Sequence, residues 1–278
     1  MADSYNDLDV HLFGLGLGLR TLPIAPRAAA KALLLPVEYI RCAEFRYVLT
    51  QLRVARGMTV LDLGSPKMLS LFMAARIGAQ VVATDLVDYF IAEYAVYARA
   101  ALRDGESFAM ETQDGQALTY ADESFDRVFS VSVIEHIPGE GDTAAMHEIA
   151  RVLKPGGLAS ITVPYSEKGY REAFGSEYWT NTPDAFNYRT YDRPTLRRRL
   201  VDGPLELVDV SFCGERRIAV EDRIISPRLP RLVKWSMFPF HLPLSRLFVD
   251  DLEEDAPSHK KVACLTLRKP DGSASRRR

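Results

Sequence analysis

The sequence predicts an α/β protein built on a Rossmann-like, mostly parallel sheet. Five short apolar runs read as strands, at residues 59–63, 80–84, 108–112, 125–133 and 158–163. Segments with helical spacing lie between them, at 66–77, 89–102 and 143–153. Continuous apolar strands that alternate with helices are typical of a parallel sheet covered on both faces. A chain of 278 residues is long enough for one such domain with additions.

The N-terminal region, residues 1–52, is expected to form a helical cap. Residues 1–30 mix Gly, Pro and Ala without a clear period, which predicts irregular structure there. From residue 28 to 52 the apolar positions follow helical spacing, with an interruption at Pro36. The Rossmann-like core is then expected over 53–165, and the Lys154-Pro155-Gly156-Gly157 stretch ends its last helix.

The last third breaks the strand–helix rhythm. A short helix near 194–200 and strands at 205–213 and 262–267 complete the sheet within residues 166–270, which also carry long inserts. Residues 271–278 are predicted to be a disordered tail.

Charge and cysteine content exclude several classes of protein. The formal net charge of −2 provides no general attraction to nucleic acid. Cys42, Cys213 and Cys264 lack metal-ligand spacing, so neither a disulfide framework nor a metal site is expected. The apolar stretch near the N-terminus is too short to cross a bilayer and is preceded by acidic residues. The prediction is a cytoplasmic protein.

Acidic residues lie at the carboxyl ends of three predicted strands. An open parallel sheet binds its ligands beyond these strand ends. Asp62 and Gly64 close the first strand, and the missing Cβ of Gly64 permits close approach of a cofactor. Asp85 comes 21 residues after Gly64, the spacing at which a carboxylate meets the hydroxyls of a ribose. Asp114 follows the third strand. The alternatives are a helix cap for Asp85 and a plain Asp-Gly turn for Asp114.

These segments together carry a family resemblance. The runs VLDLG, VVATD, QDGQAL, SFDRVFSVSVIEHI and RVLKPGGLASITVPY, between residues 58 and 165, are similar to class I S-adenosylmethionine (SAM)-dependent methyltransferases. The branch they resemble is the small-molecule, ubiquinone-type branch, also called methyltransferase type 11. The resemblance implies a seven-stranded sheet whose last strand is antiparallel, and a reaction that converts SAM to S-adenosylhomocysteine.

The resemblance also implies which residues bind SAM. Asp62, Gly64 and Ser65 would lie beside its methionine part. Asp85 and Leu86 would hold the ribose and adenine side, and Asp114 and Gly115 would meet the adenine. Ser132 and Val133 would line the cofactor at the end of the fourth strand.

The turn after the first strand departs from the family pattern. Pro66 and Met68 stand where the family has two further glycines. Ser65 suits a helix N-cap and Pro66 the first helical position, so the helix can still begin there. A dinucleotide needs those glycines for its pyrophosphate, which disfavours NAD. Tyr39 or Arg41 of the cap is a candidate to hold the methionine carboxylate, although both suit ordinary surface positions.

His136 is the candidate catalytic residue. It follows the fourth strand, and a histidine can act as general base towards a hydroxyl acceptor at neutral pH. The alternative is that Glu135 and His136 only cap the loop before Pro138. Some ubiquinone-type relatives use a Glu-x-x-Glu-His metal motif, but Ser132 replaces the first carboxylate here, so no metal is predicted.

Aromatic residues after the fifth strand are candidates for the acceptor pocket. They are Tyr165, Tyr170, Tyr178, Trp179 and Tyr188, which can equally pin down a long loop. The basic and aromatic segment 228–248 suits a lid or dimer contact, or a peripheral contact with a membrane surface.

The sequence therefore predicts a SAM-dependent methyltransferase acting on a small, apolar or aromatic, lipid-like acceptor. Two rivals are an enzyme that uses the same fold and cofactor for other chemistry, and a SAM-fold protein that serves as a binding or partner module. A homodimer is compatible with the sequence, which does not fix the oligomeric state.

Overall fold

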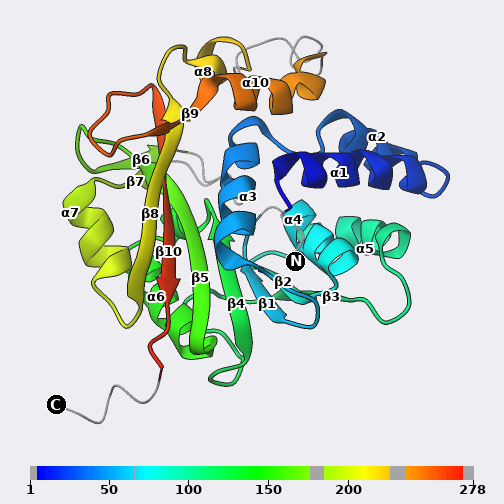
Figure 1. The fold of residues 1–278 in the computed structure, drawn as a ribbon, viewed down its shortest axis with the longest axis horizontal. Helices are drawn as coiled ribbons and strands as arrows, with labels where there is room; N and C mark the ends of the chain where they lie inside the picture. Colours follow the sequence, from blue (N-terminus) through cyan, green and yellow to red (C-terminus); the bar gives the residue numbers. More distant parts are fainter. Residues whose placement is uncertain (1–4, 66, 176–184, 226–235, 272–278) are drawn as a thin grey trace.

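The computed structural model describes residues 5–65, 67–175, 185–225 and 236–271. Its centre is an eight-stranded sheet (Figure 1). Along the sheet the strands are β3 (Ser107–Thr112), β2 (Gln80–Asp85), β1 (Thr59–Leu63), β4 (Phe125–Val131), β5 (Leu153–Tyr165), β10 (Lys260–Arg268), β8 (Glu206–Glu215) and β9 (Val249–Leu252).

The sheet confirms the mostly parallel architecture with an antiparallel last strand. β3, β2, β1, β4 and β5 pair in parallel. β10 lies antiparallel between β5 and β8. The expectation of seven strands is corrected by β9, which comes from the late insert and pairs with the edge of β8. The pairing supplies that edge with backbone partners that it would otherwise lack.

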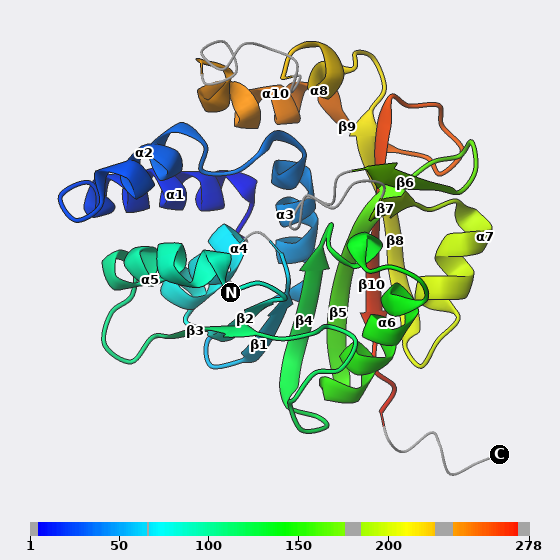
Figure 2. The ribbon, with the colours of Figure 1, turned by 180° about the vertical axis from the view of Figure 1, so that it is seen from behind.

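Helices cover both faces of the sheet (Figures 1 and 2). One face carries α1 (Asp7–Thr21), α3 (Tyr39–Leu52), α4 (Lys67–Phe72) and α5 (Tyr89–Ala101), with α2 (Pro26–Leu34) beside them. The other face carries α6 (Gly141–Val152) and α7 (Arg193–Leu196). Alternate strand residues point to the two layers: Val60 of β1 packs in the first, and Leu61 and Leu63 pack in the second.

The prediction of irregular structure over residues 1–30 is wrong for the described residues 5–30, because α1 and the start of α2 lie there. Asn6 and Asp9 form a reciprocal capping box at the start of α1. Val10, Phe13 and Leu17 then bury one face of the helix. A Cβ on Gly14 would lie 2.7 Å from Pro36 Cβ, and one on Gly18 would lie 2.6 Å from Leu33 Cγ. These glycines thus mark close helix contacts rather than a flexible segment.

The late region adds elements at the end of the sheet where the parallel strands finish. β6 (Arg171–Gly175) and β7 (Ala185–Thr190) form a separate antiparallel hairpin. α8 (Val220–Arg223) and α10 (His241–Phe248) lie above α3 in Figure 1. Short turns of 3-10 helix at Ile134–His136 and Phe238–Phe240, and of π-helix at Met73–Ile77 and Arg197–Val201, complete the described elements.

None of the helices within the described ranges combines the length and apolar character that crossing a bilayer requires. Of the tail expected from residue 271, positions 272–278 lie outside the described residues.

Candidate functional site

The carboxyl ends of β1, β2 and β4 meet at Gly64. The Gly64 N–H donates to Thr84 O at 3.0 Å, which joins the turn after β1 to the end of β2. Gly64 has a φ of +74°, and a Cβ there would lie 2.5 Å from Val133 Cγ1. The glycine is therefore required by its backbone conformation and by a neighbouring side chain, before any cofactor approaches.

Asp62 organises the turn from inside. Its side chain is fully buried, and it accepts hydrogen bonds from the Ser65 N–H at 2.8 Å and from the Ser70 hydroxyl. The Oγ of Ser65 accepts from the Val131 N–H at 2.7 Å, which ties the turn to β4. Pro66 lies outside the described residues.

Lys67 is the residue at this turn that the sequence did not single out. Its side chain is only 2% exposed, and Nζ donates to Thr84 O at 2.6 Å. Nζ also lies 3.7 Å from Asp62 Oδ2 and 3.7 Å from Asp85 Oδ2. One buried cation thus stands between two of the carboxylates assigned to the cofactor. The available signal was a single lysine in the otherwise apolar segment Lys67-Met68-Leu69.

Asp85 ends β2 at the surface of this turn. Its side chain is 14% exposed, and Oδ1 accepts a long hydrogen bond of 3.4 Å from the Val87 N–H. Leu86, predicted beside the ribose, is mostly exposed. A carboxylate in this position, accessible at the end of the second strand, has the acceptor chemistry that a ribose diol requires.

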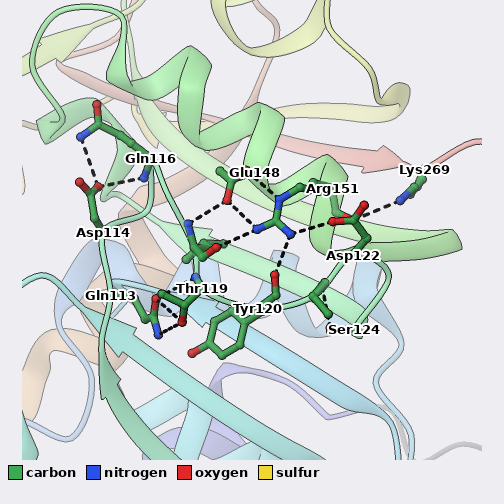
Figure 3. A network of polar contacts seen from close by, with 12 residues as sticks. Gln113, Asp114, Gln116, Thr119, Tyr120, Asp122, Ser124, Glu148, Arg151 and Lys269 are labelled. Carbon is green, nitrogen blue, oxygen red and sulfur yellow. Dashed lines mark hydrogen bonds and ion pairs between the residues drawn. The ribbon is translucent and has the colours of Figure 1, made fainter.

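Asp114 lies in an exposed turn after β3, shown in Figure 3. Its Oδ1 accepts from the Gln116 N–H at 2.9 Å and from Gln116 Nε2 at 3.2 Å, which are the contacts of an Asx turn. Gly115 follows Asp114 directly, and a Cβ there would lie 3.2 Å from Leu63 Cδ1, so the turn packs against the end of β1.

Arg151 of α6 holds the rest of this loop in place (Figure 3). Its guanidinium donates to Leu118 O at 2.8 Å and to Tyr120 O at 2.7 Å. It also pairs with Glu148, which in turn accepts from the Leu118 N–H at 2.8 Å. Residues 118–122, which follow the Asp114 turn, are therefore held by α6, on the opposite face from the cap.

A buried polar network joins the cap helix α3 to the end of β4. Ser132 has a φ of +49°, and its Oγ donates to Glu44 Oε1 at 2.8 Å. Thr162 of β5 donates to the same oxygen at 2.7 Å, and Arg41 donates to Glu44 Oε2. Arg41 Nε is buried without a hydrogen-bond partner among the described residues. Glu44 was missed because the sequence does not show that a charged helix residue is buried.

The other cap candidate, Tyr39, does not face this site. It packs in the cluster that contains Cys213, Val220 and Cys264. Its backbone N–H donates to His241 Nδ1 at 3.1 Å, which links α3 to α10 instead.

Glu135 and His136 follow Ser132 in a 3-10 turn. Glu135 is 1% exposed, and its Oε2 has no hydrogen-bond partner within the described part of the chain. Burial raises the pKa of this carboxyl to about 8, so it carries a proton at neutral pH. His136 Nδ1 lies 2.7 Å from Asn187 O, and its Nε2 lies 4.0 Å from Glu135 Oε1.

The environment of His136 favours a neutral ring. Burial lowers its pKa below 6.5, the nearby Arg41 charge lowers it further, and the Asn187 carbonyl raises it in part. The carbonyl of Asn187 can only accept, so Nδ1 carries the proton and Nε2 keeps its lone pair.

The aromatic candidates separate into three groups. Tyr188 lies with its ring 6.0 Å from that of His136 and is partly exposed. Tyr165 is buried in the core against Phe212, and Tyr170 donates to Glu172 on the β6–β7 hairpin. Tyr178 and Trp179 lie outside the described residues. Among the aromatic candidates that the structure describes, Tyr188 lies beside His136.

The segment 228–248 is described from residue 236 onward. Within it, Arg246 of α10 pairs with the buried Asp7 at 2.8 Å and also donates to Asn6 at 3.2 Å. Leu242 is buried, whereas Phe240 and Leu247 are exposed. Arg246 of α10 thus forms an ion pair within the molecule, with Asp7 of α1.

Comparison with known proteins agrees with this fold. Residues 61–161 match the family model described as a methyltransferase domain. A ubiquinone biosynthesis O-methyltransferase of Xanthomonas euvesicatoria pv. vesicatoria is 30% identical over 182 residues, which cover 63% of this chain and 74% of that protein. The chain therefore belongs to the class I SAM-dependent methyltransferases, and its cofactor is SAM.

Solved structures show the same fold at low sequence identity. The [4+2]-cyclase SpnF has a TM-score of 0.54 and 22% identity, over 85% of this chain and 84% of that one. Geranyl diphosphate C-methyltransferase from Streptomyces coelicolor A3(2) also has a TM-score of 0.54, with 15% identity over 82% and 80% of the two chains.

Proposed function

We propose that this methyltransferase transfers the methyl group of SAM to a hydroxyl of a small apolar or aromatic acceptor, with His136 as general base. The observation that carries the proposal is the hydrogen bond between His136 Nδ1 and Asn187 O. It fixes the tautomer that leaves Nε2 as a proton acceptor at the end of β4.

The chain offers groups that suit each part of the cofactor. Asp85 would accept from the ribose hydroxyls, and the Asp114–Gly115 turn would lie at the adenine. Arg41, with its unpartnered Nε, would hold the methionine carboxylate in place of the missing glycine backbone. Leu86, Ser132 and Val133 would line the remaining surface. When bound, SAM supplies an electrophilic methyl group on a positively charged sulfur.

The contribution of the protein would be to position the acceptor and remove its proton. A neutral His136 would take the hydroxyl proton on Nε2 and pass it to solvent, since about two fifths of its side chain (41%) is exposed. Glu135, protonated at neutral pH, would add no negative charge that binds this proton more tightly. Base catalysis of this kind contributes about 10²–10⁴-fold to a rate.

Two features support an apolar or aromatic acceptor. Tyr188 lies beside His136, and the exposed Phe174 packs edge-on against Phe186 on the same hairpin, so aromatic surface stands next to the proposed base. The Xanthomonas relative carries the name of a ubiquinone biosynthesis O-methyltransferase, whose acceptor is an oxygen atom by that name.

The first experiment asks whether the chain binds the cofactor. Calorimetric titration with S-adenosylhomocysteine should give a binding isotherm that is strongly weakened by Asp85→Ala. If the wild-type protein did not bind S-adenosylhomocysteine, the proposed methyltransferase function would be wrong. The rival, in which this fold serves as a binding module, would then be favoured.

The second experiment asks what is methylated. The protein is incubated with methyl-labelled SAM and a set of phenols and hydroxylated apolar compounds, and label is counted in the organic extract. His136→Ala should lower the transfer rate about 10²-fold or more. His147→Ala, on the exposed side of α6, should leave it unchanged. Label confined to polar products would contradict the apolar acceptor.

A further inference from the structure

Lys67 places a positive charge inside the proposed cofactor site. Its ammonium group donates to the Thr84 carbonyl at 2.6 Å and lies 3.7 Å from each of Asp62 and Asp85. The side chain is 2% exposed, so water screens this charge weakly. By formal charge the three groups sum to one net negative charge, whereas the two carboxylates alone would sum to two.

That local charge bears on which form of the cofactor binds. SAM and S-adenosylhomocysteine differ by a methyl group and by one positive charge, which SAM carries on its sulfur. The sulfur is bonded to the carbon next to the ribose ring, and the ribose is the part assigned to Asp85. A cation beside Asp85 therefore opposes SAM and leaves the product, whose sulfur is neutral, largely unaffected.

We infer that Lys67 is a specificity-determining residue that weakens the binding of SAM relative to S-adenosylhomocysteine. The inference rests on the proposed cofactor site at Asp85. With Lys67 present, S-adenosylhomocysteine should inhibit the enzyme more strongly, relative to the binding of SAM, than it would without the lysine. Lys67 also joins the turn after β1 to the end of β2 through its hydrogen bond to Thr84 O.

The test measures two dissociation constants in each protein. Kd values for SAM and for S-adenosylhomocysteine are determined by calorimetry for the wild type and for Lys67→Met, Lys67→Gln and Lys67→Arg. Removal of the charge should lower the ratio Kd(SAM)/Kd(S-adenosylhomocysteine) about tenfold, as expected for one buried charge acting over several ångströms. Lys67→Arg keeps the charge and should keep the ratio.

The ratio separates charge from structure. A variant that only disturbs the turn weakens both ligands together and leaves the ratio unchanged, and an unchanged ratio in folded Lys67→Gln would overturn the inference. The Gln variant decides the matter where the Met variant does not fold, because its amide can still donate to the Thr84 carbonyl. Wild-type protein that binds neither ligand would overturn the cofactor site itself, which is a different result.

Discussion

Two buried carboxyl groups, Glu135 and Asp142, lie on either side of the Pro138 turn and differ in their hydrogen-bond partners. Asp142 Oδ2 accepts from Tyr191 at 2.6 Å and from Arg199 Nε at 2.7 Å, and Arg189 lies 2.7 Å away. These partners lower its pKa although burial alone would raise it. Glu135 has an unpartnered oxygen, and its pKa is raised to about 8.

The difference separates a structural group from a group at a site. The two arginines and the tyrosine join β7 and the Arg197–Val201 turn to α6 through Asp142, so that carboxylate fixes the base of the β6–β7 hairpin. Glu135 stands beside the proposed base and near Arg41, where buried polar atoms lack partners. Buried polar groups are normally satisfied, so the unpartnered carboxyl oxygen of Glu135 beside the proposed base is a candidate contact for a ligand.

The largest expected effect comes from removing the satisfied carboxylate. Asp142→Asn should lower the free energy of unfolding by about 3–5 kcal/mol, because Arg189, whose side chain is fully buried, loses its counter-charge. Denaturant unfolding measures the loss. A change below about 1 kcal/mol would show that the cluster can rearrange, and the comparison with Glu135 would fail.

Glu135→Gln should act in the opposite direction and depend on pH. The folded-state pKa of about 8 exceeds the ordinary value of 4.5, so the stability that protonated Glu135 contributes is full below pH 4.5 and is lost as the pH rises through 8. The amide resembles the protonated acid and does not titrate. The free energy of unfolding of the variant should therefore exceed that of the wild type by a few kcal/mol at pH 8. Parallel stability curves from pH 5 to 9 would contradict the assignment.

Arg41→Met tests whether the second unpartnered group holds the cofactor. Affinity for S-adenosylhomocysteine should fall about tenfold, the loss expected for one charge-assisted hydrogen bond. Affinity for 5′-methylthioadenosine, which lacks the amino acid part, should not change. Arg46→Met on the same helix serves as the matched control. Equal losses for both ligands would show that Arg41 acts only through the fold of α3.

The smallest effect is a shift in a pH profile. Burial lowers the pKa of His136 below 6.5. As the pH is lowered, the rate of methyl transfer should therefore stay constant past pH 6.5 and fall only at lower pH, when one proton binds to His136. Steady-state kcat/KM against pH measures this. A fall that begins above pH 7 would mean that another group is the base.

The parallel core could be predicted because each strand is a continuous apolar run that packs on both faces. The positions of Asp62, Gly64 and Asp85 at the ends of β1 and β2 could be predicted for the same reason, since the end of an apolar run marks where a strand stops. Helix α1 was missed because Gly14 and Gly18 look like breakers, and their use as contacts for Pro36 and Leu33 depends on the tertiary fold. The strand β9 was missed because four residues carry too little pattern.

Long-range contacts limited the prediction of the site. Glu44 meets Ser132 and Thr162 from 88 and 118 residues away, and no local period announces such a meeting. The partner of His136 is a backbone carbonyl, at Asn187, which leaves no trace in the residue types. Tyr165 was placed at the acceptor, yet its ring packs against Phe212 in the core at the end of β5.

The ion pair between Asp7 and Arg246 joins α1 to α10, the first and last helices among the described residues. Residue 7 leaves the ribosome long before residue 246. During synthesis the Asp7 carboxylate therefore cannot form its ion pair until most of the chain has emerged. α1 can dock on α3, α4 and α5 in the meantime, but the contact with α10 closes only near the end of translation. The order of synthesis thus makes the clasp between the two helices one of the last contacts to form.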